Sequence, residues 1–361
     1  MTPLRSWPQA PFHSHILSAI KGAGQPDVDA SPCEQTLRLL RFDMRLTLEG
    51  ALAAADRSPG GGAREAAAQP IAPTLPGPAA SCTSVTRKRG NEEASMEDES
   101  PVLVERCAGY RVITLNRPKQ LNAFNEAMHQ ALKRALADAE DDSDCRALML
   151  TGAGRAFCSG QDLRERISKD GKTTVLGSAL ETYYNPLVRK LRALPFPVVA
   201  AVNGVAAGAG ANIALACDVV LAARSATFVQ AFAKIGLVPD SGGTWFLPRL
   251  VGPARARGLA LTGDPLPAEK AEAWGLIWKM HDDLVLMAEA HRLCVHFTEA
   301  PTVALALIKR LLDESWANDL DSQLDLERET QREASLTPDY AEGMRAFFEK
   351  RAPAFSGRKS S

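Results

Sequence analysis

The segment that most constrains the fold joins a buried strand to a glycine-rich helix start. Val198–Val202 is an apolar run typical of a buried strand, and Asn203–Asn212 follows it with three glycines. A helix that begins directly after a strand presents its first backbone N–H groups to an anionic ligand. A second segment, Leu237–Thr244, sets the carboxylate of Asp240 before two glycines. Backbone donors near one carboxylate are the groups needed to remove a proton next to a carbonyl and stabilise the enolate.

Apolar patterning from residue 101 onward predicts alternating strands and helices, followed by an almost wholly helical C-terminal third. This order is typical of an α/β protein with parallel sheet content. Asn125 is a suitable N-cap for a helix, and Asn185 followed by Pro186 predicts the cap and first turn of another. The predicted strands are Val102–Cys107, Tyr110–Leu115, Ala147–Thr151, Val198–Val202, Val219–Ala222 and Ala226–Val229. The predicted later helices are Thr244–Leu250, Pro253–Leu261, Ala268–Trp274, Leu284–Phe297, Thr302–Trp316, Leu320–Ala334 and Pro338–Phe348.

Composition limits the classes of function. The 361 residues carry a formal net charge of −1, so no basic face for nucleic acid is indicated. The longest apolar tract, residues 196–223, is interrupted by Asn203, Asn212 and Asp218 and does not predict a membrane span. Seven cysteines without a paired spacing favour a reducing compartment over a disulfide framework. The six histidines have no metal-ligand spacing, so we expect a cytoplasmic protein without a metal, a nucleic-acid partner or a membrane contact.

Residues 1–95 differ in character from the rest of the chain. Proline- and glycine-rich runs such as Ser58–Gly62 and Pro70–Pro78 predict a low-complexity, disordered extension. No charged segment followed by an apolar one indicates a secretion signal, and several acidic residues argue against a transit peptide. We expect the extension to be dispensable and the working protein to begin near Met96.

The glycines and Ser159 could also indicate a dinucleotide-binding site or a nucleophilic serine, but the sequence favours neither. Gly152-Ala-Gly154 and Gly208-Ala-Gly210 each lack the third glycine and the following acid of a dinucleotide-binding fingerprint. Ser159 has no G-x-S-x-G context, so a nucleophilic serine is not favoured. Tight strand–helix packing without any ligand stays open as the role of the glycines at 204–210.

Four segments together resemble the crotonase (enoyl-CoA hydratase/isomerase) superfamily: Leu115–Phe124, Gly152–Leu163, Asn203–Asn212 and Phe348–Phe355. The resemblance covers about residues 101–356 and implies an α/β, ClpP/crotonase-like fold of stacked ββα units. It divides the chain into the extension at 1–95, a core at 96–290 and a C-terminal helical trimerisation region at 291–361. A homotrimer or a dimer of trimers is therefore expected.

Within the superfamily, Tyr184–Leu191, Val205–Ala211 and Pro239–Trp245 look most like the 1,2-epoxyphenylacetyl-CoA isomerases of phenylacetate degradation. In such enzymes two backbone N–H groups form an oxyanion hole that binds the thioester oxygen. By position, these groups come from Gln161 and Ala209. Side-chain identity matters little for backbone donors, and nearby glycines allow the backbone to approach a ligand closely.

The carboxylates distinguish the reactions of this superfamily. Its hydratases use two glutamates, and the matching positions here hold Asn212 and Phe232, neither of which can exchange a proton. A carboxylate stands instead at Asp240, as in isomerase-type members, where one base can remove a proton and return it elsewhere. A helix N-cap bonded to the N–H of Gly242 or Gly243 is the alternative role for Asp240.

The resemblance also implies contacts with the rest of an acyl-CoA. Coenzyme A is part of the substrate, and no separate cofactor is implied. Asp162 has an alternative role as a structural cap of the helix that follows it. The expected substrate- and CoA-binding residues are Ser159, Gly160, Asp162, Gly208, Lys119 and Lys350, and the expected pocket residues are Phe232, Trp245 and Tyr184.

Together these residues predict an isomerase that converts ring-1,2-epoxyphenylacetyl-CoA to oxepin-CoA in aerobic phenylacetate catabolism, with one aspartate as the base. One alternative is a general Δ3,Δ2-enoyl-CoA isomerase or weak enoyl-CoA hydratase. The other is a non-catalytic, crotonase-fold protein that binds RNA, which the near-neutral charge does not favour.

Overall fold

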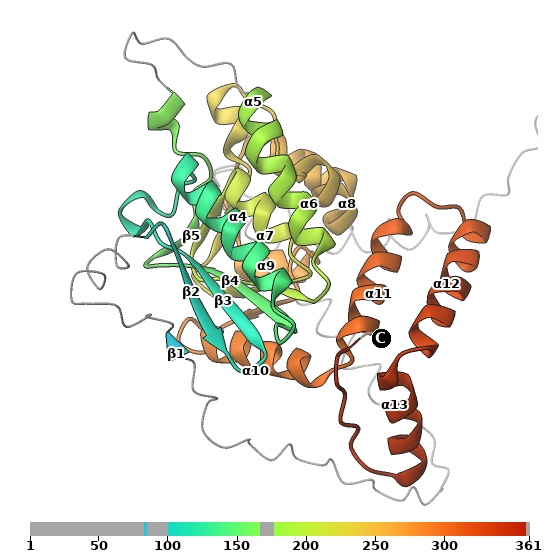
Figure 1. Ribbon diagram of the computed structural model, residues 1–361. Coiled ribbons are helices and arrows are strands. Elements are labelled where there is room, and N and C mark those ends of the chain that lie inside the picture. The colour runs from blue at the N-terminus through green and yellow to red at the C-terminus, as the bar shows by residue number, and fades with distance from the viewer. Residues whose placement is uncertain (1–82, 85–99, 167–176, 359–361) are drawn as a thin grey trace, which may run out of the picture. The chain divides into compact units, whose positions relative to one another are not determined.

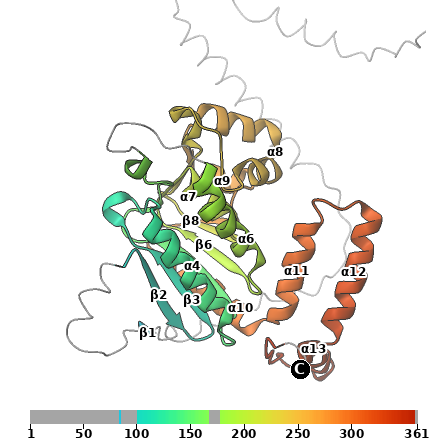
Figure 2. The same cartoon turned by 45° about the horizontal axis from the view of Figure 1, so that its top comes forward.

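Two β-sheets organise the part of the chain that this computed structural model describes, residues 83–84, 100–166 and 177–358. Strands and helices alternate as far as residue 281, and helices follow from residue 286 (Figures 1 and 2). The predicted alternation of strands and helices and the helical C-terminal region are therefore confirmed, whereas strands at residues 266–267 and 279–281 were not predicted. The extension expected at residues 1–95 lies outside the described residues, except for the short strand β1 (Thr83–Ser84). The helices up to residue 299 are α4 (Glu126–Asp141), α5 (Gly177–Ala179), α6 (Asn185–Ala193), α7 (Ala209–Leu215), α8 (Gly243–Thr262), α9 (Ala268–Ala273) and α10 (Leu286–Glu299).

The larger sheet contains seven strands. They are β1, β2 (Val102–Cys107), β3 (Tyr110–Leu115), β4 (Ala147–Gly152), β6 (Val198–Val202), β8 (Val219–Ala223) and β11 (Lys279–His281), in this order across the sheet. The first three strands pair antiparallel, and all later neighbours are parallel. The predicted hairpin is confirmed, since Val102 pairs with Leu115 and the turn contains Gly109 at a φ of 78°.

A second sheet contains four short strands, in the order β10 (Leu266–Pro267), β9 (Thr227–Val229), β7 (Val205–Ala207) and β5 (Ala156–Cys158). Patterning predicted β9 alone among them, and the other three strands have only two or three residues, which gives an alternating pattern little length in which to be recognised. β5 comes shortly after β4, and β7 comes shortly after β6. β9 likewise follows β8, so the chain passes from the large sheet to the small one three times at the carboxyl ends of neighbouring parallel strands.

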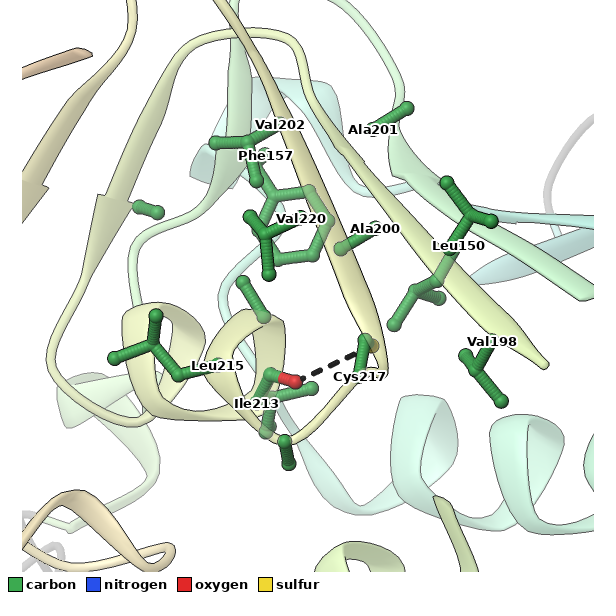
Figure 3. Close-up of a cluster of buried hydrophobic side chains, with 14 of the residues drawn as sticks. Leu150, Phe157, Val198, Ala200, Ala201, Val202, Ile213, Leu215, Cys217 and Val220 are labelled. Carbon is green, nitrogen blue, oxygen red and sulfur yellow. Dashed lines mark hydrogen bonds between the residues drawn. The ribbon is translucent and has the colours of Figure 1, made fainter. Parts of the chain in front are cut away.

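The large sheet is covered on both faces. Leu150 of β4 lies in a buried cluster with Ile213 of α7 (Figure 3). The next residue, Thr151, has its hydroxyl 3.9 Å from Met287 Sδ of α10. Because successive side chains of a strand alternate between faces, β4 is buried on both sides, which explains its almost unbroken apolar sequence.

The two predicted helix caps have different outcomes. Asn125 caps α4 as expected, because its Oδ1 accepts a hydrogen bond from Met128 N at 2.9 Å. The cap predicted at Asn185 is wrong, since a π-helical segment, η4 (Leu180–Tyr184), runs directly into α6 and the chain is already helical there. The two helices predicted between residues 244 and 261 are confirmed, since α8 consists of two helical parts separated by a non-helical break at Gly252. No helix within the described residues is long and apolar enough to cross a membrane.

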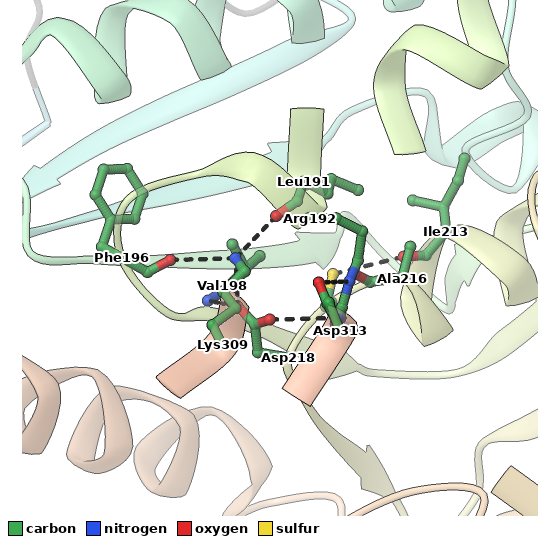
Figure 4. A network of polar contacts seen from close by, with 10 residues as sticks. Leu191, Arg192, Phe196, Val198, Ile213, Ala216, Asp218, Lys309 and Asp313 are labelled. Atoms are coloured by element: carbon green, nitrogen blue, oxygen red, sulfur yellow. Dashed lines mark hydrogen bonds and ion pairs between the residues drawn. The ribbon is translucent and has the colours of Figure 1, made fainter. Parts of the chain in front are cut away.

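The C-terminal region consists of α11 (Thr302–Glu314), α12 (Leu320–Ser335) and α13 (Pro338–Glu349). A polar network attaches α11 to the sheet (Figure 4). In this network, Lys309 Nζ lies 2.8 Å from Asp218 Oδ2. α12 and α13 leave several large apolar side chains exposed, namely Leu320, Leu324, Leu336, Met344, Phe347 and Phe348.

One cysteine departs from the expectation of a chain without disulfides. Cys107 is disulfide-bonded. The other cysteines of the described part of the chain are free and buried, namely Cys145, Cys158, Cys217 and Cys294. Burial raises the pKa of the Cys158 thiol to about 12, which keeps it protonated, as expected of a buried packing residue.

Candidate active site

Two loops approach each other closely where the parallel strands of the second sheet end. One follows β5 and contains Gly160, and the other precedes α7 and contains Gly208. A β-carbon at Gly160 would lie 2.9 Å from Ala207 O and 3.4 Å from Ala209 N, so the approach requires glycine. Gly208 has a φ of 54° and a ψ of −128°, a conformation that side chains disfavour. The approach brings Gln161 and Ala209, the two expected N–H donors, to neighbouring positions.

Backbone pairing orients the N–H of Gln161. Gln161 forms a parallel bridge with Phe124, in which Phe124 N donates to Gly160 O at 2.7 Å and Asp162 N donates to Phe124 O at 2.9 Å. In such a bridge the N–H of the central residue points away from the pairing strand. Ala209 is the first residue of α7, where backbone N–H groups have no acceptor within the helix.

Asp240 stands immediately before a left-handed turn that leads into α8. Ser241 and Gly242 have φ values of 50° and 82°, and Gly243 N donates to Asp240 O at 2.8 Å. The N-cap of α8 is Gly242, which has no side chain. The backbone carbonyl of Asp240 therefore accepts from the helix start. Its Oδ1 accepts a hydrogen bond from Ser241 Oγ at 2.9 Å.

The first turns of α7 connect Asp240 to the Gln161–Ala209 loops. Asn212 Nδ2 donates to Asp240 O at 2.8 Å, and Gln230 Nε2 donates to Asn212 Oδ1 at 2.8 Å. The ring of Phe232 is buried, and its Cζ would lie 3.7 Å from a β-carbon at position 208. The two positions that hold glutamates in hydratases by resemblance therefore carry an amide engaged in hydrogen bonds and a phenyl ring near the start of α7.

Asp162 is engaged with the chain itself. Its Oδ2 accepts from Arg117 Nη2 at 2.9 Å, and its Oδ1 accepts from Arg164 N at 3.2 Å in the 3-10 segment η3 (Leu163–Arg166). These contacts match the alternative role of a structural cap. A direct contact of Asp162 with coenzyme A stays a prediction.

Tyr184 supports the loop that carries Gln161. Its hydroxyl donates to Gln161 Oε1 at 2.8 Å, and its ring packs edge-on against Phe124 at 5.9 Å between centroids. The side chain is only 1% exposed and offers little surface to a ligand. Its expected place in the acyl pocket stays a prediction, whereas its contact with the loop is a direct structural observation.

Ser159 connects the Gln161 loop to the loop that carries Lys119. Ser159 N donates to Leu121 O at 3.0 Å, and its hydroxyl donates to Gln120 O at 3.3 Å. Lys119 lies on the 3-10 turn that precedes these acceptors and is exposed. The structure therefore brings Lys119 to the same edge of the sheet as Gln161.

Lys350 is not brought to this edge by any contact described within the single chain. It ends α13 in a left-handed conformation and is exposed. The segment after it reaches Arg146, whose Nη1 donates to Phe355 O at 3.1 Å. Arg146 comes just before the start of β4, whereas Gly152 is the last residue of β4. The two ends of a six-residue strand are roughly 17–20 Å apart, so the C-terminal segment contacts the chain at the end of β4 opposite to Gly152.

A large cavity among the described residues lies elsewhere. Its volume is about 820 Å³, and it is lined by Leu194 and Phe196 before β6 and by Leu307 of α11. Trp245 of α8 also lines it, whereas Gln161, Ala209 and Asp240 do not. Trp245 packs edge-on against Trp316, at 6.0 Å between ring centroids. The cavity is therefore a groove beside the C-terminal helices rather than the space between the candidate catalytic groups.

Sequence reasoning missed two residues that hold the site together. Gln230 orients Asn212, and Arg117 binds Asp162. Neither contact has a local signal, because the partners are 18 and 45 positions apart in the sequence. Arg117 lies within a segment that resembles the superfamily and could have been nominated on that ground.

Comparison with known proteins agrees with this geometry. The family profile for enoyl-CoA hydratase/isomerase matches residues 105–358. The chain belongs to this family. It is 53% identical to the 1,2-epoxyphenylacetyl-CoA isomerase of Escherichia coli K12 over 251 residues, which cover 69% of this chain and 96% of the relative. It is 47% identical to a Rhodobacter capsulatus protein named "Probable enoyl-CoA hydratase", over 69% of this chain and 95% of the relative. The crystal structure of enoyl-CoA hydratase from Bacillus anthracis superposes with a TM-score of 0.66 at 31% identity, over 72% of this chain and 100% of that chain.

These comparisons confirm the α/β crotonase fold and the resemblance found in the sequence. The protein is a crotonase-family enzyme of acyl-CoA substrates. Relatives with two different activities have similar identities to it, so the choice between the two reactions depends on the site residues.

Proposed function

We propose that this protein is an acyl-CoA isomerase that converts ring-1,2-epoxyphenylacetyl-CoA to oxepin-CoA in aerobic phenylacetate catabolism. One observation carries the proposal. Asn212 stands at the position of a hydratase glutamate, and its amide NH2 group donates a hydrogen bond to Asp240 O at 2.8 Å. A hydratase needs acids that activate and add water, and this site offers an amide and a phenyl ring there. The 53% identity to the E. coli isomerase supports the same choice.

The backbone N–H groups of Gln161 and Ala209 would hold the thioester oxygen. Two donors preorganised around the position of an oxyanion stabilise developing negative charge without reorganisation during the reaction. Asp240 would act as the base and proton shuttle, taking a proton next to the thioester carbonyl while the electron pair moves to the held oxygen. In the epoxide reaction the C–C bond between the two epoxide carbons breaks and its electron pair joins the ring double bonds, which gives the seven-membered ring. Returning the proton to another carbon then completes an isomerisation with no net gain or loss of atoms, so no added cofactor is needed.

Further substrate contacts belong to the same proposal. Phe232, whose ring lies beside Gly208, would border the acyl ring, since aromatic side chains suit a six- or seven-membered ring. Ser159, Gly160, Asp162 and Gly208 would lie along the acyl-CoA, and cations would bind its phosphates. Lys119 is placed to do so from its own chain, and Lys350 would do so from a second copy.

We propose a homotrimer or a dimer of trimers, assembled through the C-terminal helices. Phe347 and Phe348 of α13 are 75% and 74% exposed in the single chain, and such a concentration of exposed apolar surface indicates an interface. Sedimentation equilibrium of the full chain should give three or six times the chain mass. A monomer at micromolar concentration would contradict this assembly.

Asp240→Asn tests the proposed reaction. The amide keeps the size of the carboxylate and can still accept from Ser241 Oγ, but it cannot take a proton at neutral pH. Turnover of the epoxide thioester should fall by at least about 10²-fold, while folding and acyl-CoA binding persist. Asp264→Asn, at an exposed loop, is the matched control and should keep parental turnover. Equal turnover by Asp240→Asn and the parent would refute the assignment.

A general Δ3,Δ2-enoyl-CoA isomerase is the second candidate, because moving a double bond also needs only one base and an oxyanion hole. Assays with a 3-enoyl-CoA, with crotonyl-CoA and with the epoxide thioester separate the candidates. Faster turnover of the 3-enoyl-CoA than of the epoxide would favour the second candidate. Hydration of crotonyl-CoA as the fastest reaction would refute both.

A further inference from the structure

A buried chain of amide hydrogen bonds ends on the backbone of Asp240. Asn212 is 0% exposed and Gln230 is 3% exposed, so neither amide exchanges its partner for water. Gln230 Nε2 donates to Asn212 Oδ1, and Asn212 Nδ2 donates to Asp240 O, each at 2.8 Å. A β-carbon at Gly243 would lie 2.3 Å from Asn212 Nδ2, so the amide packs directly against the backbone that leads into α8.

The direction of this chain is fixed by chemistry. The carbonyl of Asp240 can only accept, so Asn212 must present its NH2 group to it and its oxygen to Gln230. Gln230 must then present its own NH2 group to Asn212. Exchanging the oxygen and nitrogen of either amide would set two acceptors or two donors against each other.

The turn that receives this hydrogen bond is strained. Ser241 has a φ of 50°, which few residues other than glycine adopt, and it is 2% exposed. A conformation of this kind persists only where surrounding contacts hold it. Asp240 O has two such contacts, from Gly243 N and from Asn212 Nδ2.

We infer that Asn212 is a positioning residue that aims the Asp240 carboxylate, and that Gln230 orients Asn212 for this task. The inference rests on the proposed role of Asp240 as the base. It adds that position 212 separates isomerase from hydratase by what it donates as well as by the acid it lacks. A glutamate there would lose the N–H donor to Asp240 O, and Gly243 leaves no space for its extra methylene.

The experiment uses Asn212→Leu, Gln230→Leu and the double variant in the full chain. Asn212→Leu keeps the shape of the side chain but leaves the buried Gln230 amide without its partner, so the thermal midpoint should fall. The double variant removes both polar groups and should recover much of that loss. A displacement of about 1 Å in a catalytic group can lower the rate by about 10²-fold. We therefore expect kcat to stay at least about tenfold below the parent in Asn212→Leu and in the double variant, with KM changed less than about twofold.

The recovered midpoint of the double variant is what separates positioning from stability. A double variant with a recovered midpoint and parental kcat would overturn the inference, and so would parental kcat in any folded variant that lacks the Asn212 amide. Thr151→Val is the matched control, since it removes a buried hydrogen bond of 2.8 Å to Ala201 O away from Asp240. It should lower the midpoint and leave kcat unchanged.

The Asp240→Asn variant separates the positioning role of Asn212 from the proposed reaction. An inactive Asp240→Asn enzyme with a fully active Asn212→Leu enzyme would leave the proposed reaction standing and overturn only the positioning role. An active Asp240→Asn enzyme would overturn the proposed reaction itself.

Discussion

Removing the cation of Lys309 should destabilise the junction between α11 and the sheet. The Lys309 side chain is 8% exposed, and its Nζ contacts Asp218 Oδ2 at 2.8 Å and Leu191 O at 3.0 Å (Figure 4). Lys309→Met keeps the length of the side chain and leaves the Asp218 carboxylate without its nearest cation. Breaking a buried ion pair from one side costs about 3–5 kcal/mol.

The remaining partners of Asp218 set the magnitude at the lower end of that range. Its Oδ2 still accepts from Val198 N at 2.8 Å, and Arg192 Nη1 lies 3.5 Å from its Oδ1. We therefore expect a loss of about 3 kcal/mol in the free energy of unfolding. For a domain of this size that corresponds to a fall of roughly 6–12 °C in the thermal midpoint.

The loss should depend on pH in a definite direction. Burial raises the pKa of the Asp218 carboxyl, and the charges of Lys309 and Arg192 oppose that rise. Without Lys309 the folded-state pKa rises further. A folded-state pKa above the unfolded value means that stability is retained at low pH and lost as pH rises through the folded-state pKa. The difference between variant and parent should therefore be largest at neutral pH and shrink on acidification.

Urea denaturation at several pH values measures both effects. Arg310→Met is the matched control on the same helix, because Arg310 pairs with Glu333 at the surface and such pairs contribute about 1 kcal/mol or less. Adding Asp218→Asn to Lys309→Met removes the uncompensated charge and should recover most of the loss. A loss below about 1 kcal/mol, or a loss that grows on acidification, would refute the reasoning.

Two further substitutions test the support of the proposed oxyanion hole. Gly160→Ala should lower kcat by about 10²-fold or more in steady-state assays, because its β-carbon would lie only 2.9 Å from Ala207 O. The control is Gly258→Ala, whose β-carbon would meet nothing within 4 Å and which should keep parental kcat. Tyr184→Phe should lower kcat by about 2–10-fold through loss of the hydrogen bond to Gln161, and an unchanged kcat in a folded variant would show that the loop holds itself.

The sequence predicted elements with strong local signals. The β2–β3 hairpin was identified from a glycine between two apolar runs, and α4 from a cap followed by apolar residues at helical spacing. The other short strands of the second sheet, β5, β7 and β10, were not predicted, because their pairing is set by neighbours in space. The false cap at Asn185 arose since Asn-Pro is also compatible with the continuation of a π-turn into a helix.

The candidate site was predicted in part for similar reasons. The glycines at 160 and 208 and the isolated Asp240 are visible in the chain, and the structure explains the glycines by close approach and backbone conformation. The contacts of Gln230 and Tyr184 were not predictable, because each depends on residues brought together only by the fold. The residue types gave no signal either, because amide and phenol side chains are equally common as buried polar residues outside functional sites.

The proposed donors of this site are backbone groups and the proposed base is a side chain, and this difference affects how activity responds to substitution. The proposed donors at Gln161 and Ala209 are backbone groups, so side-chain substitution at these positions leaves the N–H groups in the chain. What substitution can remove is the support of those groups: the absent β-carbon at Gly160 and the Tyr184 hydroxyl on one loop. On the other side, Asn212 supports the backbone of the proposed base. Sensitivity to mutation should therefore peak at residues beside the reacting atoms, and Asp240 should be the one reacting group whose own side chain is indispensable.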